Sequence, residues 1–475
     1  MTIAKSGSAN FTFLLLAIGV GAISMLQSLL SPVLPTLQAE LNTTRGAVAW
    51  VIIAFLLSSA VATPILGRIG DTTGKVRTLL VALGAIAIGS LVSALAPNIE
   101  TLVVSRAIQG LGAAAFPLSF GIIRDRLPAE RVAPAVSSLA SVIAVGGGVG
   151  VVLAGPVVGV LGWRALFWIP AALLAIVMLL VWRFLPETDN RAEGRINWLA
   201  GALLAGWLVA LLLPLSQGTL WGWTSPGVLL SFALALVLSV AWFQVEIRSA
   251  QPLIDMRMMA LPTVWRTNLV ALLFGGAMFA VWAFLPQFAE IPPSAGYGFG
   301  ASVTQAGWLI LPMLVTMGAA GMVSGRIARR VSFRRQMALG SGIAGVAILG
   351  LALWHQSLWQ TMVSSGLFGL GLGLVYSTMI NVIVQAVPPS QTGVASGMNA
   401  NIRTIGGAIG TAVMTAIVTS HHQPNGIPVE SGFTAGFILF AIVAAAAMLV
   451  SLMLPRAQPR PVALSDEAAL SAPAE

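Results

Sequence analysis

The chain has 475 residues, of which 57% are hydrophobic and only 8% are charged. A soluble domain is about 45–50% apolar and about 25% charged, so this composition excludes a soluble globular protein. The net charge of +9 is spread over short segments between apolar runs, whereas a nucleic-acid-binding surface would gather it on one face. Cysteine is absent, which excludes disulfides, thiolate metal sites and cysteine nucleophiles. We therefore expect a membrane protein without a nucleic-acid partner, metal or cofactor.

Fourteen apolar runs reach the length of about 20 residues that a helix needs to cross a bilayer. In chain order the predicted spans are 11–36, 46–66, 77–97, 101–123, 134–160, 163–185, 197–216, 225–246, 264–288, 302–323, 335–354, 358–384, 395–419 and 433–455. They predict an all-α polytopic membrane protein with 14 transmembrane helices. The first run continues to about Pro35 without a small-residue cleavage site, so we interpret it as a helix and not as a removed signal.

Lys and Arg accumulate in alternate loops. Arg45 and Arg164 fall in one set of loops, Arg106 and Arg403 fall within predicted helices, and the other 20 of the 24 basic residues fall in the second set or the termini. Because cytoplasmic loops carry the excess of Lys and Arg, we expect both termini in the cytoplasm. The use of only two Lys among the 24 basic residues, with abundant Ala, Gly and Val, favours a bacterial source and thus the bacterial inner membrane. Residues 457–475 are polar and predict a disordered cytoplasmic tail.

An internal repeat divides the chain. Residues 67–77 (GRIGDTTGKVR) recur 258 positions later as 325–335 (GRIARRVSFRR), and the same shift brings the glycine-rich region 146–150 into the region of Gly406, Gly407 and Gly410. We expect an N-terminal six-helix half at 1–190, an inserted helix pair with linkers at 191–260, and a C-terminal six-helix half at 261–456. Duplicated six-helix units with a substrate site between them are typical of secondary transporters.

These segments resemble the motifs of the Major Facilitator Superfamily, in its fourteen-helix branch of multidrug:proton antiporters. The matching segments are Trp50 with Val51, 67–80, 106–112, 155–159, Trp163 and Arg164 with Phe167, 185–188, 221–223, 393–397 and 403–407. The resemblance implies a monomeric transporter in membrane lipid that exports small amphipathic molecules by alternating access, with protons as the coupling ion. No nucleophile elbow, metal-ligand spacing or acid pair occurs within the predicted helices, so we expect no enzymatic activity.

The 67–77 segment predicts a gate formed by Gly67, Asp71, Gly74, Lys75 and Arg77, with Arg124. An anion is favourable at a helix N-terminus, and 387–392 is a predicted cytoplasmic loop without Lys or Arg, just before the thirteenth span. We therefore expect Asp71 to dock on the start of that span, with Arg124 or Arg126 nearby, and to close the cytoplasmic side. The alternative is a charged loop that only anchors the topology.

Two arginines within predicted helices are candidates for transport or coupling. A cation inside a membrane helix is costly and usually faces a cavity or a partner; the resemblance links Arg106, with Gln109 one turn later, to proton transfer or substrate. Arg403 has an analogous place in the thirteenth span, and a structural role remains open for both. In the fifth span, Gly155, Pro156 and Gly159 resemble the antiporter motif and predict close packing on the tenth span, although Val151 and Val160 stand where the family has glycine.

No carboxylate falls in the middle of a predicted helix, and Leu26 stands where relatives typically carry an Asp. This favours neutral, zwitterionic or anionic substrates over cations, and leaves Glu246, Asp71 or Asp125 as the remaining proton carriers. The predicted substrate cavity is lined by polar and aromatic residues, each of which could instead pack or contact lipid: Gln27, Ser31, Trp50, Phe55, Gln109, Trp282, Gln287, Gln305, Trp308, Met313, Tyr376, Asn381 and Asn399. Two other functions remain open, a dedicated metabolite exporter and a membrane sensor that binds without transporting.

Overall fold

The computed structural model describes residues 3–188, 190–192, 196–328, 330–421, 423 and 427–455. Within this part of the chain, fourteen helices are long and apolar enough to cross a membrane, as the sequence predicts. The predicted tail at 457–475, Arg329 of the second repeat copy and the side chain of Ser31 lie outside the described residues.

The helices are as follows: α1 (Ile3–Leu29), α2 (Leu34–Glu40), α3 (Arg45–Thr73), α4 (Lys75–Ala94), α5 (Ile99–Gly110), α6 (Ala115–Arg126), α7 (Ala129–Leu161), α8 (Ala165–Phe184), α9 (Trp198–Trp221), α10 (Pro226–Arg248), α11 (Met256–Met259), α12 (Pro262–Glu290), α13 (Val303–Ile327), α14 (Phe333–Leu353), α15 (Leu358–Ala386), α16 (Thr392–Val418) and α17 (Glu430–Leu452). Short 3₁₀ turns, η1 (Ser31–Val33), η2 (Leu111–Ala114), η3 (Pro293–Ala295) and η4 (Pro389–Gln391), connect or precede some of them.

The 67–77 segment is not the loop that the charge pattern predicted. Residues 67–73 form the last two turns of α3, and Lys75 already begins α4. A single residue, Gly74, makes the turn with φ at 129°, a backbone conformation that side chains disfavour. The helix therefore continues through charged residues beyond the apolar run. The sequence prediction followed the apolar run alone and placed the end of the helix too early.

Proline and 3₁₀ turns divide two of the predicted spans. The span predicted at 11–36 is α1 followed by η1 and α2, where Pro32 and Pro35 interrupt the helix. The fourth span consists of α5 and α6, joined through η2. Neither break changes the number of membrane crossings.

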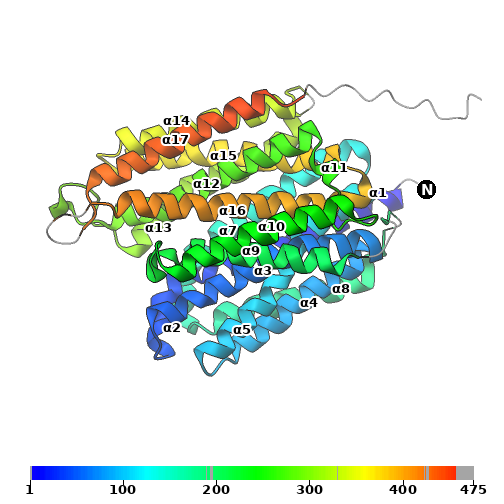
Figure 1. The fold of residues 1–475 in the computed structure, drawn as a ribbon, viewed down its shortest axis with the longest axis horizontal. Helices are drawn as coiled ribbons and strands as arrows, with labels where there is room; N and C mark the ends of the chain where they lie inside the picture. Colours follow the sequence, from blue (N-terminus) through cyan, green and yellow to red (C-terminus); the bar gives the residue numbers. More distant parts are fainter. Residues whose placement is uncertain are drawn as a thin grey trace, which may run out of the picture.

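The two halves lie side by side as separate helix groups (Figure 1), with the N-terminal half in blue to cyan and the C-terminal half, from α12 onward, in green to red. They meet along two seams, where α16 packs on α3 and α6, and where α13 and α15 pack on α7. The end of the bundle that carries residues 67–77, at the right in Figure 1, is called the motif end below, and the opposite end is called the far end.

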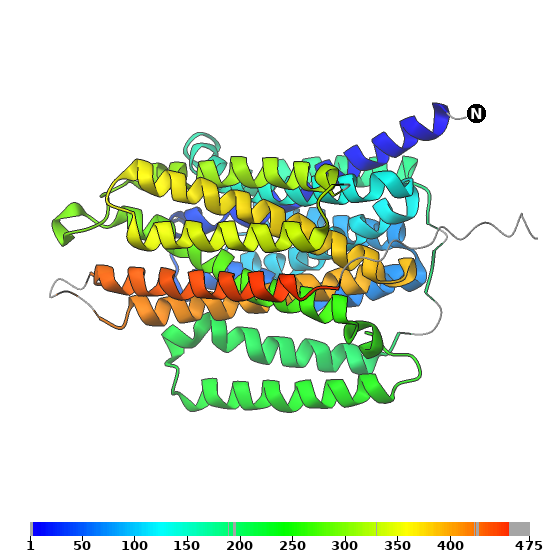
Figure 2. The same ribbon diagram turned by 90° about the horizontal axis from the view of Figure 1, so that it is seen from above.

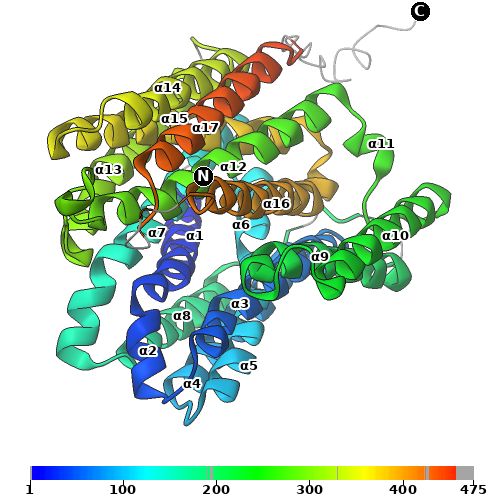
Figure 3. The same cartoon turned by 60° about the vertical axis from the view of Figure 1, so that its left-hand side comes forward.

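The inserted pair lies outside both halves. Helix α9 packs on α3 and α16, and α10 packs on α9, so that the pair flanks one side of the bundle (Figures 2 and 3). In the most apolar stretch of α10 only 17% is buried inside the protein, the smallest share among the fourteen spans. Exposed side chains such as Leu236 (66%) and Val160 (84%) would be a liability in water and instead fit lipid contact.

Candidate functional site

Asp71 joins the two halves at the motif end. It lies in the last turn of α3 and is fully buried. Its Oδ1 accepts a hydrogen bond from the N–H of Gly393 at 3.2 Å, and its Oδ2 accepts one from the N–H of Val394 at 2.9 Å. Both donors are in the first turn of α16, where backbone N–H groups have no partner within the helix. The carboxylate of one half therefore caps a helix of the other, which is the contact expected from the charge gap at 387–392.

Glycine allows α3 and α16 to approach closely enough for this contact. A Cβ on Gly67 would lie 2.8 Å from the carbonyl oxygen of Gly393, and a Cβ on Gly397 would lie 3.1 Å from that of Thr63. Further from the motif end, the side-chain amide of Asn401 donates to the carbonyl of Ala60 at 2.6 Å. The seam is thus continuous over several helical turns.

Lys75 is the cation at the centre of the motif end, and it is fully buried. Its Nζ lies 2.7 Å from Oδ2 of Asp125 and 3.8 Å from Oδ1 of Asp71. It also donates to the carbonyl of Pro389 at 3.3 Å, just before α16. Because burying a lone charge is costly, these two carboxylates are what allow Lys75 to lie here.

Arg124 adds a second contact between the halves. Its Nη1 donates to Oγ1 of Thr392, the first residue of α16, at 2.8 Å. Arg126 points elsewhere and donates to the carbonyls of Pro186 and Glu187. Of the two predicted alternatives, Arg124 is therefore the one that lies beside the Asp71 contact.

Glu187 completes the motif end, and sequence reasoning missed it. Its carboxylate accepts hydrogen bonds from the N–H groups of Val76 and Arg77, each at 2.9 Å, and so caps the start of α4. A Cβ on Gly74 would lie 2.6 Å from this carboxylate. Arg77 contributes its backbone to the contact, while its side chain is exposed. The available signal was the acid in the 185–188 segment just after the sixth span, which resembles the family but was given no role.

Arg106 is buried within the N-terminal half at 1% exposure. Its Nε donates to the carbonyl of Val51 at 3.0 Å, its Nη1 donates to Oε1 of Gln109, and its guanidinium carbon lies 4.4 Å from the ring centroid of Phe55. Gln109 in turn donates to Oγ of Ser93 at 2.9 Å. Among the described residues no carboxylate forms an ion pair with Arg106. The positive charge of Arg106 is thus stabilised by contacts with neutral groups.

Arg403 is the corresponding cation of the C-terminal half. It is half-buried, and its guanidinium carbon lies 4.7 Å from the ring centroid of Tyr376. Tyr376 lines a small cavity of about 140 Å³ where α7 meets α13 and α15. This space has no room even for a water molecule, so it cannot hold a drug-sized molecule in the present conformation.

Other predicted cavity residues are buried in helix contacts. Asn381 donates to Oγ of Ser137 at 2.9 Å and so links α15 to α7 across the second seam. Asn399 donates to Oδ1 of Asn268 at 2.8 Å within the C-terminal half. Met313 is fully buried. Oδ1 of Asn381 is buried without a hydrogen-bond partner among the described residues. All three side chains are enclosed by helix contacts and would become available only if the helices moved apart.

The remaining predicted cavity residues do not converge on one site. Trp308 is 66% exposed, Gln287 is exposed, and Gln305 forms a capping box with Ser302 at the start of α13. Gln27, Trp50 and Trp282 are half-buried. Polar and aromatic character alone therefore does not place a residue in the space between the halves.

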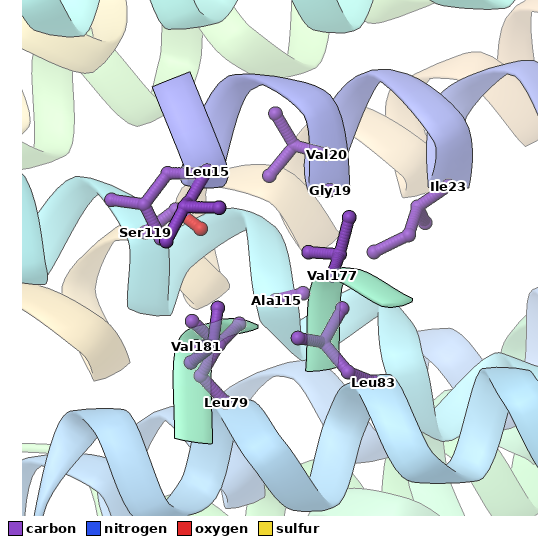
Figure 4. Close-up of a pocket in the computed structure, with 11 residues that line it drawn as sticks. Leu15, Gly19, Val20, Ile23, Leu79, Leu83, Ala115, Ser119, Val177 and Val181 are labelled. Carbon is purple, nitrogen blue, oxygen red and sulfur yellow. The ribbon is translucent and has the colours of Figure 1, made fainter. Parts of the chain in front are cut away.

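A second small cavity lies inside the N-terminal half and not between the halves. It has an empty volume of about 190 Å³ and is enclosed by α1, α4, α6 and α8 (Figure 4). Apart from Ser119, its lining is apolar or glycine. Neither its size nor its position fits a substrate site.

Helix α7 packs closely on α13 near the motif end but not near the far end. Nearer the motif end, a Cβ on Gly325 of α13 would lie 2.6 Å from Cα of Pro134 of α7, so the two helices are in close contact. Nearer the far end, no atom lies within 4 Å of where a Cβ of Gly155 or Gly159 would be, and Pro156 is exposed. The packing predicted for the 155–159 motif is therefore not made in this conformation.

Both halves of the chain match a known protein family. The model of the Major Facilitator Superfamily matches residues 16–197 and 267–474. The cephamycin export protein CmcT of Amycolatopsis lactamdurans is 30% identical over 442 residues, which cover 90% of this chain and 89% of that protein. The methylenomycin A resistance protein of Streptomyces coelicolor is 29% identical over 395 residues, covering 81% of this chain and 80% of that protein.

A solved structure shares the fold. The human organic anion transporter MFSD10 (TETRAN) superposes with a TM-score of 0.69 at 18% identity, covering 93% of this chain and 99% of that one. The family model passes over the inserted pair and matches both halves, in keeping with the position of α9 and α10 outside them. By its sequence match and its fourteen-helix fold, this chain belongs to the Major Facilitator Superfamily.

Proposed function

We propose that this protein exports small amphipathic compounds across the bacterial inner membrane in exchange for protons, by alternating access. Membership of a transporter family, together with relatives named for drug resistance and export, supports transport and efflux. The observation that carries the mechanism is the Asp71 contact, because a carboxylate of one half caps a helix of the other. Two rigid halves joined by a few polar contacts can separate as units.

The conformation fits a transporter closed at the motif end. Asp71, Lys75 and Arg124 connect the halves there, and Asn401 connects them further along the same seam. Gly155 and Gly159 of α7, nearer the far end, have no packing partner. Because cytoplasmic loops carry the excess of Lys and Arg, we expect the motif end and both termini in the cytoplasm. In this proposal the molecule faces outward, and inward opening requires the Asp71 contact to break and 155–159 to pack.

The charges within the helices favour neutral, zwitterionic or anionic substrates. Arg106 and Arg403 lie at membrane depth, and no carboxylate among the described residues pairs with either. Leu26, in the place of the usual acid, is buried at 1% exposure. An anionic group would lower the energy of these cations, whereas an organic cation would raise it.

A dedicated exporter of one natural product is the second candidate. Two relatives are named for a single compound each, methylenomycin A and cephamycin. Multidrug export and dedicated export share the same fold and gate, and differ in how many compounds are carried.

Reconstitution of the purified protein in liposomes tests these proposals. Flux of methylenomycin A, of a cephamycin and of a cationic dye is measured under a pH gradient in each direction and with the gradient collapsed by an ionophore. Proton-coupled export predicts flux of the first two compounds that reverses with the gradient, and little flux of the dye. Binding without flux would favour a sensor, flux independent of the gradient would refute proton coupling, and transport of one compound alone would favour the dedicated exporter.

A further inference from the structure

The inserted pair has no role in a scheme of two moving halves, yet it packs where they meet. An apolar cluster joins Ala60 of α3, Leu208 of α9, Trp242 of α10 and Met398 of α16. The pair therefore covers the seam between α3 and α16 that the Asp71 contact closes.

Glu246 brings a carboxylate into this covered region. It lies in the last turn of α10 and is only 2% exposed. Its Oε1 accepts a hydrogen bond from the N–H of Ile254 at 3.2 Å. Its Oε2 is buried and has no hydrogen-bond partner in the described part of the chain. A buried carboxylate with one oxygen unpartnered is costly unless a positive charge lies close to it.

Arg68 supplies that charge from the gate. It lies on α3, one turn before Asp71, and is 8% exposed. Its Nε is buried without a hydrogen-bond partner among the described residues. Arg68 lies one turn after Ile65 of α3, which packs in the same apolar cluster as Ile254, the residue that donates to Glu246. It forms no direct ion pair with either carboxylate, and its charge acts on both at longer range. Arg68 is thus near both an acid of the inserted pair and the acid that caps α16.

A purely structural role does not require the negative charge of Glu246. The contact with the N–H of Ile254 needs one acceptor oxygen, which a glutamine would provide equally well. Arg68 is the cation on which this negative charge acts, and such an interaction is stronger in a poorly solvated region than in water.

We propose that Glu246 is a positioning residue of the transport cycle, which holds Arg68 and thereby stabilises the docked Asp71, so that the inserted helix pair favours the closed motif end. This inference depends on the alternating access proposed above. It gives α9 and α10 a role, namely to shift the balance between the two conformations.

The absence of cysteine in the natural sequence allows a direct test. Thr63→Cys places a thiol in the α3–α16 seam, at a position with 4% exposure, where a membrane-impermeant maleimide reacts only when the seam opens. Thr73→Cys, at an exposed position on the same end, reports reagent access. Labelling rates are measured in each background with Glu246→Gln, with Arg68→Gln and with both, and with Glu100→Gln as a matched control at an exposed carboxylate.

Glu246→Gln is expected to raise labelling at position 63 about fivefold, the range of a coupled charge contact, and to leave labelling at position 73 unchanged. Arg68→Gln should act similarly, and the double variant should exceed neither single variant by more than about twofold, because both remove one interaction. Glu246→Asp, which keeps the charge, should stay closer to the parent rate than Glu246→Gln.

Unchanged labelling at position 63 in Glu246→Gln would overturn the proposal, as would single effects that multiply in the double variant. Faster labelling at both reporter positions would indicate general loosening and would also refute it. The assay needs neither substrate nor pH gradient. A parent protein that shows no gradient-driven flux would therefore contradict the proposed function without deciding the role of Glu246.

Discussion

Replacement of Asp71 by asparagine tests the gate most directly. Asparagine keeps one acceptor oxygen and places an NH₂ group where the second oxygen was, so one of the hydrogen bonds at 3.2 and 2.9 Å is lost together with the charge. A hydrogen bond to a charged group contributes about 1.5–3 kcal/mol, and the charge at a helix end about 0.3–1 kcal/mol. The closed conformation should therefore lose about 2–4 kcal/mol relative to the open one, which lowers the closed-to-open ratio about 30- to 700-fold.

The fold should survive this change, because Lys75 retains Asp125 at 2.7 Å. We expect normal expression, gradient-driven transport reduced at least about tenfold, and faster labelling of Thr63→Cys, since the closed state is no longer favoured. Asp71→Glu keeps the negative charge but moves it on a longer side chain. Comparison of the two variants therefore separates the effect of the charge from the effect of the contact geometry. Unchanged transport together with unchanged labelling in Asp71→Asn would refute the gate.

Three further substitutions separate coupling from conformational change. Arg106→Lys keeps the positive charge but cannot reproduce the planar fork that contacts Val51 and Gln109, so we expect transport to fall at least about tenfold while the melting temperature shifts by only a few degrees; wild-type transport would contradict this. Gly159→Ala adds a methyl group where no atom lies within 4 Å, so it should leave stability equal or higher and yet slow transport, because the opposite conformation needs α7 close to α13. Gly325→Ala, which meets the backbone of α7 at 2.6 Å, should lower both stability and transport.

The sequence predicted the helices well because bilayer crossing imposes a length and a composition that can be counted. It misplaced the end of α3, since a helix continues into charged residues until a residue such as Gly74 turns the chain. The Asp71 contact was predictable because two independent signals, an acid in the motif and a loop without basic residues, indicated the same place.

The contacts of Glu187 and Asp125 could not be predicted in this way. They join segments 111 and 50 positions apart, and nothing in the local sequence pairs these residues. The cavity list failed for Trp308 and Gln305 for a different reason. Membrane helices carry apolar residues on all sides, so periodicity does not reveal which face of a helix points inward.

The two repeat copies differ in a complementary way. In the N-terminal half, the helix that follows the fourth span is α7, and it has its own acid, Glu130, in its first turn. Its counterpart α16 has no acid in its first turn and receives Asp71 from the other half. In the second copy of the motif, Arg329 stands where the first has Asp71. Each of these two helices thus has one anion at its start. Helix α7 carries Glu130 itself, and α16 receives Asp71 from the other half.

This asymmetry leads to a test that leaves Asp71 itself intact. Gln391 immediately precedes α16 and does not cap it, since its side chain accepts no hydrogen bond from the first turn. Gln391→Asp would place a carboxylate beside the N–H groups that Asp71 uses, so that α16 has a local anion and the two like charges repel. We expect the closed motif end to weaken and labelling of Thr63→Cys to rise, with Gln391→Asn as the uncharged control. Equal labelling in both variants would mean that the halves are held together by packing alone, and that the charge of Asp71 does not set the gate.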